Sequence, residues 1–329
     1  MKIFDTFLFF QELDLLEIRL EYLYTEVDFF IILEFSQKFN GEKKEFVFEK
    51  NKKRFHKYLN KILYFKVDEI HNSYASIKNY LNNSDYSVDQ KILEFLDSHE
   101  HYSKKDLNWV LDAFQKEFMH HFYSLYIKDT DLVIFSDLDE IPSISFLNTI
   151  KNDPKLNSYF FVANQIEFKY FTNLMSSNIW LGSIAGMYSN MSIKSLNDLR
   201  RQSKLICKEI AGAGFHFTSC GGEALLISKI NSWGHQEYNY PFLKKTALNR
   251  VTSGYDAFAR QLWKINKVVS LDNRVIFDSK ITRILTLFPH LTVSKLTHFS
   301  ILDRTSLICV YFLNILIRIK MKLKKYAAG

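Results

Sequence analysis

Hydrophobic and polar positions in the first half of the chain follow the periods of strands and helices in turn. Four apolar runs have the length and continuity of buried strands: Ile3–Phe10, Asp28–Phe35, Lys61–Val67 and Asp131–Phe135. Helical spacing of apolar residues predicts helices over Glu12–Tyr24 and Asp106–Tyr126. Strands buried on both faces and joined by helices predict an α/β fold, a mostly parallel sheet flanked by helices.

The pattern changes after the fourth strand. Ser158–Phe171 and Trp180–Met187 are rich in aromatic residues and favour strands, whereas Glu223–Trp233 favours a helix. The polar stretch Asn72–Ser103 is interpreted as an inserted loop region. No internal repeat is visible.

Charge is concentrated at the carboxyl end. The formal net charge of the 329 residues is +7, but residues 280–329 hold nine Lys or Arg and one acid, a net +8. The remainder, residues 1–279, therefore carries −1, which argues against a surface that follows nucleic-acid phosphates. Three cysteines without a CxxC pair favour a thiol-reducing compartment.

The carboxyl-terminal segment, residues 301–329, combines apolar and basic residues. Leu307–Ile317 is apolar except for Asn314, and Arg318 and four lysines follow it. This pattern predicts a helix that lies on an anionic membrane surface. The alternative is a helix that docks on the core and ends in solvated lysines. No run reaches the roughly 20 apolar residues that a spanning helix needs.

An acidic cluster follows the fourth predicted strand, in the sequence Ser-Asp-Leu-Asp-Glu-Ile-Pro. Because ligands bind at the carboxyl ends of strands in open α/β sheets, Asp137 and Asp139 are well placed for a hard divalent cation. Mn²⁺ or Mg²⁺ with diphosphate oxygens would suit this site. The alternative is a helix N-cap cluster in which Asp139 or Ser143 accepts backbone N–H groups.

Two enzyme chemistries use such a pair. In a haloacid-dehalogenase-type phosphatase, Asp137 would be the nucleophile and Asp139 the acid/base, but the chain lacks the later DD or GD pair of that family. In a sugar-nucleotide glycosyltransferase, the pair holds the metal that stabilises the departing nucleotide.

Four ordered blocks resemble glycosyltransferase family seventeen, the family of the β-1,4-mannosyl-glycoprotein 4-β-N-acetylglucosaminyltransferases. They are Phe4–Leu20, Leu33–Asn51, Ser136–Pro142 and Gly212–Asn239. The resemblance implies a GT-A-like, Rossmann-type sheet, a nucleotide-sugar donor expected to be UDP-GlcNAc, a divalent metal and inversion at the anomeric carbon. The family commonly has Phe-Gln-Arg-Asn where this chain has Phe114–Glu117.

The resemblance also implies an organisation of the chain. Residues 1–300 would form the catalytic domain, with a nucleotide-sugar half over about 1–142 and an acceptor half over about 143–300. The acceptor would be an oligosaccharide, a polysaccharide or a glycolipid. The animal enzymes carry an N-terminal anchor that this sequence does not show, so we expect a cytoplasmic protein, peripheral on the inner face of the membrane.

The predicted site residues fall into three groups. The metal ligands are Asp139, Asp137 and His216. The donor-binding residues are Glu34, Gln115, Lys116, Asp137 and Arg200. The candidates for the catalytic base are Glu223, Glu140 and His235. Trp180 and Trp233 are the candidate acceptor platforms.

A reading from another class stays open at this point. The chain would then be a membrane-associated glycan-binding protein that keeps the fold without turnover. Lys116 and Glu117, which depart from the family pattern, favour it, whereas the intact acidic pair favours the enzyme.

Overall fold

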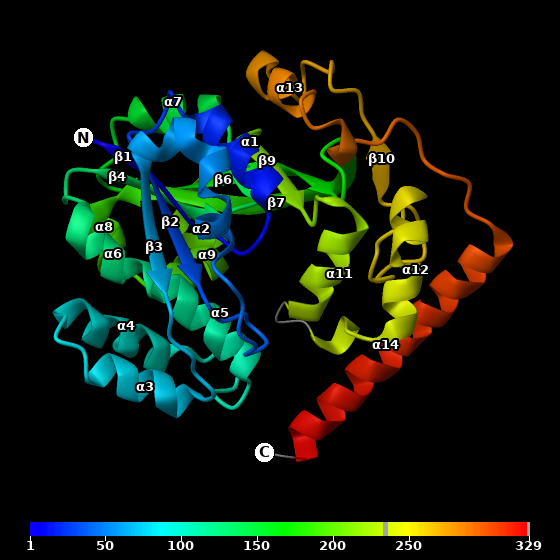
Figure 1. The fold of residues 1–329 in the computed structure, drawn as a ribbon, viewed down its shortest axis with the longest axis horizontal. Coiled ribbons are helices and arrows are strands. Elements are labelled where there is room, and N and C mark those ends of the chain that lie inside the picture. Colours follow the sequence, from blue (N-terminus) through cyan, green and yellow to red (C-terminus); the bar gives the residue numbers. More distant parts are fainter. Residues whose placement is uncertain (233–235, 328–329) are drawn as a thin grey trace. The chain divides into compact units, whose positions relative to one another are not determined.

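The computed structural model describes residues 1–232 and 236–327 (Figure 1). These residues form two compact units. Unit 1 comprises Met1–Ile166 and Ile179–His216, and unit 2 comprises Glu167–Asn178 and Phe217–Gly329.

Four parallel strands form the central part of unit 1. They are β1 (Ile3–Leu8), β2 (Phe29–Phe35), β3 (Ile62–Val67) and β4 (Leu132–Asp137). They lie side by side in the order β3-β2-β1-β4, with every pair parallel. Strand β2 is apolar on both faces and almost fully buried, as a central parallel strand must be. The predicted α/β fold is confirmed.

The sheet of the described residues continues beyond β4 as β4-β7-β6-β9-β5. These strands are β5 (Glu140–Pro142), β6 (Phe160–Lys169), β7 (Leu174–Met187) and β9 (Gly214–Thr218). Strand β8 (Cys207–Ile210) pairs with β6, and β10 (Asn266–Val268) pairs with β7. The antiparallel pairs β4–β7 and β5–β9 mark the end of the parallel region.

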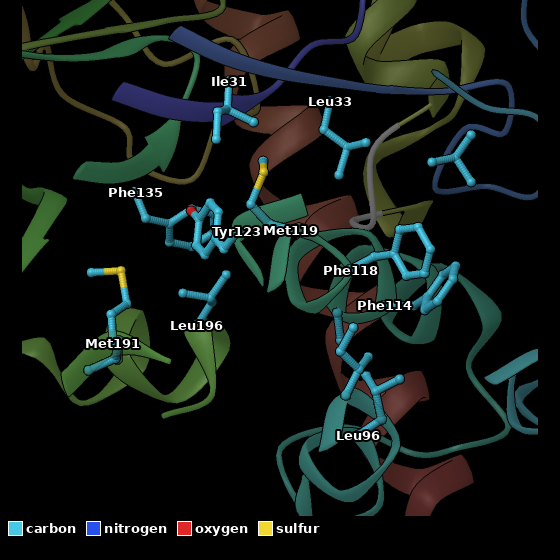
Figure 2. Close-up of a cluster of buried hydrophobic side chains, with 14 of the residues drawn as sticks. Ile31, Leu33, Leu96, Phe114, Phe118, Met119, Tyr123, Phe135, Met191 and Leu196 are labelled. Atoms are coloured by element: carbon cyan, nitrogen blue, oxygen red, sulfur yellow. The ribbon is translucent and has the colours of Figure 1, made fainter. Parts of the chain in front are cut away.

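Helices cover both faces of the parallel region (Figure 1). The helical elements of unit 1 are α1 (Leu13–Leu23), α2 (Val47–Asn51), the 3₁₀ helix η1 (Lys52–Lys61), α3 (Tyr74–Asn82), α4 (Ser87–Ser98), α5 (Leu107–Glu117), α6 (Met119–Tyr126), α7 (Ile144–Lys151), α8 (Tyr188–Met191), α9 (Leu196–Arg201) and α10 (Ser203–Ile206). Figure 2 shows the core between the sheet and one helical layer, where Ile31 and Leu33 face Met119 and Tyr123.

The interpretation of Asn72–Ser103 as a loop region is wrong, because helices α3 and α4 occupy most of it. Ile77 and Leu81 of α3, and Ile92 and Leu96 of α4, are spaced four apart and fully buried. The polar residues that suggested a loop belong to the exposed faces of these helices. The predicted helix Asp106–Tyr126 is α5 followed by α6.

Unit 2 has its own core. Its helical elements are α11 (Gly222–Ser232), the 3₁₀ helix η2 (Gln236–Tyr238), α12 (Pro241–Thr252), α13 (Ser279–Leu285), the 3₁₀ helix η3 (Pro289–Leu291) and α14 (Ile301–Ala327). Leu307 and Val310 of α14 pack with Leu243 and Ala247 of α12. The expected helix in the basic segment is therefore present. Within the described residues, no helix combines the length and the apolarity that crossing a membrane requires.

Candidate active site at the carboxyl end of strand β4

The acidic cluster lies where the order of the parallel strands reverses. From β1 the chain continues to β2 on one side and later returns to β4 on the other, so β1 and β4 flank the switch point. Strand β4 ends at Asp137, which pairs in register with Leu8 of β1. Ligands of doubly wound sheets bind at such a point, beyond the carboxyl ends of the strands.

A buried arginine shapes the turn that carries the cluster. Arg19 of α1 is fully buried and donates to both carboxylate oxygens of Asp5, at 2.6 and 2.8 Å. It also donates to the carbonyl oxygens of Asp137, Leu138 and Glu140, at 2.9, 3.0 and 3.1 Å. Sequence reasoning gave Arg19 no role. The available signal was a cation four residues from Leu15 and Leu23, on the buried stripe of a helix.

Glu140 is the fully buried centre of a second network. Its oxygens accept hydrogen bonds from both terminal nitrogens of Arg200, each at 2.7 Å, and from the indole N–H of Trp180 at 2.6 Å. Arg200 also donates to Oδ2 of Asp137 at 2.9 Å. Burial alone would lower the pKa of Arg200, but the charges of Asp137 and Glu140 raise it above its usual value, so the guanidinium is permanently charged.

Asp139 and His216 face each other across the β5–β9 pair. Nε2 of His216 lies 3.7 Å from Oδ1 of Asp139, and the Trp180 ring packs 4.7 Å from the imidazole centroid. The buried Nδ1 of His216 has no hydrogen-bond partner among the described residues. Gly214 allows the close pairing, because a Cβ there would lie 2.3 Å from the carbonyl oxygen of Ile141.

Lys116 belongs to the same neighbourhood. Its ammonium group donates to both oxygens of Asp112, at 2.9 and 3.0 Å. Burial lowers the pKa of Lys116, but the charges of Asp112 and Asp137 outweigh that effect and keep the pKa above its usual value. This neighbourhood contains four carboxylates and two cations: Asp112, Asp137, Asp139, Glu140, Arg200 and Lys116. A divalent cation would neutralise the excess negative charge. Its oxygen donors suit Mn²⁺ or Mg²⁺.

The helix that follows the cluster has its own cap. Ser143 is the N-cap of α7, and its hydroxyl accepts from the backbone N–H of Phe146 at 3.1 Å. Of the two capping candidates, the structure therefore uses Ser143, and the acidic pair is not needed to begin α7.

Two of the predicted donor-binding residues lie elsewhere in unit 1. Glu34 is fully buried and accepts from the Lys44 ammonium group and from the backbone N–H of Val47, both at 2.6 Å. These contacts hold the start of α2 in place. Gln115 donates to the carbonyl oxygen of Gln37 at 2.9 Å. Their donor-binding roles remain predictions.

The remaining candidates for the catalytic base, Glu223 and His235, follow the last residue of unit 1 in the sequence. Glu223 is an exposed residue in the first turn of α11, in unit 2. His235 and Trp233 lie outside the described residues. Their roles remain predictions as well.

Glu117, which departs from the family pattern, is fully buried and faces α9. Its carboxylate accepts from the Ser195 hydroxyl at 2.5 Å and from the backbone N–H groups of Leu196 and Asn197 at 3.0 and 3.1 Å. These are the first residues of the helix that carries Arg200. Although burial raises the pKa of Glu117, hydrogen bonds from His99 and Ser195 bring it below its usual value.

Comparison with known proteins identifies a family and a set of distant folds. Residues 1–87 match the sequence profile of Glycosyltransferase family 17. A search of curated proteins found no match. Two similar solved structures are 4-diphosphocytidyl-2C-methyl-D-erythritol synthase from Anaerococcus prevotii and mouse xyloside xylosyltransferase 1 in its apo form.

Both structural likenesses are remote. The synthase has 11% identity and a TM-score of 0.29, covering 64% of this chain and 86% of its own. The xylosyltransferase has 11% identity and a TM-score of 0.30, covering 61% of this chain and 72% of its own. The profile match alone therefore confirms the resemblance to glycosyltransferase family 17, over residues 1–87, and it supports a glycosyltransferase.

Proposed function

We propose that the chain transfers a sugar, GlcNAc from UDP-GlcNAc, to a glycan hydroxyl with inversion, in a reaction that needs Mn²⁺ or Mg²⁺. The observation that carries this proposal is the position of Asp137 and Asp139 at the strand switch point, beside the cations Arg200 and Lys116. A nucleotide diphosphate bound there would meet both the metal-binding carboxylates and the cations that neutralise its charge.

The roles in this proposal follow from the contacts. Asp139, Asp137 and His216 would hold the metal, which supplies charge stabilisation to the leaving diphosphate. Arg200, whose terminal nitrogens bind Glu140 and Asp137, would supply a fixed positive charge to the diphosphate, and Lys116 adds a second one. Glu140 has both oxygens engaged by Arg200 and Trp180, so it positions Arg200 and does not act as the base. Glu223 and His235 are then the candidates for deprotonating the acceptor.

The test is thermal stabilisation by a panel of UDP-sugars, each with and without Mn²⁺. A ligand that binds only the folded state raises stability by about 2.7 kcal/mol at one hundred times its Kd. We expect a metal-dependent rise in Tm with UDP-GlcNAc that is absent in Asp139→Asn. Asp85→Asn removes an exposed carboxylate of unit 1 elsewhere and should keep the rise.

Two outcomes would overturn the proposal. A rise of equal size in Asp139→Asn would remove the metal role of the acidic pair. No rise with any nucleotide would favour the glycan-binding alternative. For the preferred donor, the anomeric configuration of the product, read by NMR, tests inversion directly.

We further propose that α14 places the enzyme on an anionic membrane surface, at the cytoplasmic face, where a glycolipid acceptor would be presented. One side of α14 packs in unit 2 through Leu307 and Val310. Exposed apolar residues occupy other positions of the helix: Ile301, Leu302, Ile308, Phe312, Leu313, Leu316 and Ile319. Lysines follow in the sequence, and an apolar face beside a basic end suits an anionic surface.

Flotation with liposomes tests this second proposal. The double variant Phe312→Glu/Leu316→Glu should lose binding to anionic vesicles by at least tenfold, since each buried apolar side chain contributes about 1.5–3 kcal/mol. Leu205→Glu changes an exposed leucine of unit 1 and serves as the matched control. Equal flotation of all three proteins would refute the proposal.

A further inference from the structure

A second group of metal-ligating side chains lies in unit 1, apart from the acidic pair. It consists of His99 and His101, between α4 and α5, and Asp198 of α9. Oδ1 of Asp198 is 3.0 Å from Nε2 of His101 and 3.5 Å from Nδ1 of His99. All three ligand atoms lie within 4.8 Å of one another. Among the described residues, this is the one group of three or more His, Cys, Asp or Glu side chains whose ligand atoms all come this close together.

The buried histidine of this group has an unused nitrogen. The His99 side chain is 1% exposed, and its Nδ1 has no hydrogen-bond partner among the described residues. Its other nitrogen, Nε2, lies 3.3 Å from Oε1 of the fully buried Glu117. A carboxylate that accepts the N–H of one imidazole nitrogen leaves the lone pair of the other for a metal, the usual arrangement of histidine ligands.

The spacing and the chemistry of the donors fit zinc. Tetrahedral Zn²⁺ with bonds of about 2.0–2.2 Å separates its ligand atoms by about 3.4 Å. The distances from Oδ1 of Asp198 to the two imidazole nitrogens, 3.0 and 3.5 Å, bracket that value. Two imidazole nitrogens and one carboxylate oxygen suit Zn²⁺, whereas the acidic pair suits harder ions.

The group is also accessible. The side chains of His101 and Asp198 are 32% and 36% exposed. Asp198 lines a cavity of about 510 Å³ within unit 1, together with Ser195 and Leu199. A metal held by three protein ligands would thus keep a coordination position open to solvent.

We propose that His99, His101 and Asp198 form a second metal site that binds Zn²⁺, separate from the acidic pair. The bound ion joins the segment before α5 to α9. Because α9 also carries Arg200, which pairs with Asp137 and Glu140, the zinc site fixes the helix that positions this cation. His99, His101 and Asp198 are thus positioning residues with respect to sugar transfer.

The test is metal binding to tag-free, chelator-stripped protein, measured by zinc titration and by the visible absorption of the Co²⁺ form. We expect one equivalent of Zn²⁺ per chain and the intense absorption of tetrahedral Co²⁺. His101→Ala removes a direct ligand and should weaken zinc binding by roughly 100-fold. Removal of a residue that only supports a ligand already weakens metal binding by about 10–100-fold. Asp198→Asn should behave likewise, and circular dichroism checks that both variants fold.

Two controls separate this site from others. His56→Ala removes an exposed histidine of unit 1 and should bind zinc as the wild type does. Asp139→Asn should also keep zinc binding, so failure of the proposed donor site would leave this result unchanged. No stoichiometric zinc in the wild type would overturn the inference, as would unchanged affinity in His101→Ala. Loss of zinc binding in Asp139→Asn would do the same, because it would place the ion at the acidic pair.

Discussion

Replacement of Arg19 by methionine tests whether this buried cation holds the active-site turn in place. The substitution keeps most of the side-chain volume but leaves the fully buried carboxylate of Asp5 without its guanidinium partner. It also removes the donors to the carbonyl oxygens of Asp137, Leu138 and Glu140. Removing one partner of a buried ion pair costs about 3–5 kcal/mol.

That loss should be visible in both stability and activity. For a unit of this size, 1 kcal/mol shifts Tm by about 2–4 °C, so we expect Tm to fall by roughly 10 °C. Sugar transfer measured at 15 °C, where the variant is still folded, should fall by about 100-fold, because misplacing catalytic groups by about 1 Å has that effect. Differential scanning calorimetry measures Tm, and a coupled UDP-release assay with the proposed UDP-sugar donor measures transfer.

Arg54→Met is the matched control. Arg54 also pairs with carboxylates of α1, Asp14 and Glu17, but its side chain is 33% exposed. Exposed pairs contribute about 0–1 kcal/mol, so this variant should stay within about 3 °C of the wild type and keep its activity. If Arg19→Met matched Arg54→Met in Tm and in turnover, the turn would not depend on Arg19 and the argument would be wrong.

Three further variants test other parts of the structure. Arg200→Lys replaces the fork with one ammonium group, so UDP-sugar affinity should fall about tenfold in a thermal-shift titration; unchanged affinity would exclude Arg200 from the donor site. Gly214→Ala should lower the free energy of unfolding in urea by about 2–4 kcal/mol, because the new Cβ would clash with the carbonyl oxygen of Ile141. Gly212→Ala, whose Cβ would have no atom within 4 Å, should lower it by only about 1–2 kcal/mol. Equal losses would refute the close-approach argument. Burial raises the pKa of Asp256, but the hydrogen bonds and charge of Arg260 bring it below its usual value. The carboxylate therefore contributes stability that is fully present above about pH 4 and is lost as the pH falls through the lowered pKa. Between pH 6 and pH 3, the Tm of Asp256→Asn should therefore fall less than the Tm of the wild type. Parallel curves of Tm against pH would contradict a stabilising role of the Asp256 carboxylate.

The parallel strands could be predicted because they are continuous apolar runs whose burial leaves little choice of structure. The predicted strand Asp28–Phe35 and the observed β2 differ by one residue. The position of the acidic pair also followed, because a strand that enters a parallel sheet delivers the next residues to its carboxyl edge. These features depend on residues close together in the sequence.

The networks around the pair could not be predicted, because their members are far apart in the sequence. Arg19 lies 118 residues before Asp137, and Arg200 lies 60 residues after Glu140. The indole N–H of Trp180 donates to Glu140, a contact that the sequence did not predict, and the role of Trp180 as an acceptor platform remains a prediction. A single sequence shows that a charge occurs on a buried face, but not which distant group neutralises it.

The two departures from the family pattern at positions 116 and 117 belong to one arrangement. Lys116 provides a point charge where the family commonly has arginine, and the guanidinium near Asp137 comes instead from Arg200 of α9. A cation supplied from a six-residue helix is useful only if that helix is fixed. Glu117 fixes it by accepting from Ser195, Leu196 and Asn197, at the end where α9 begins. Glu117 therefore positions the helix that carries Arg200, which gives this departure from the family pattern a structural role.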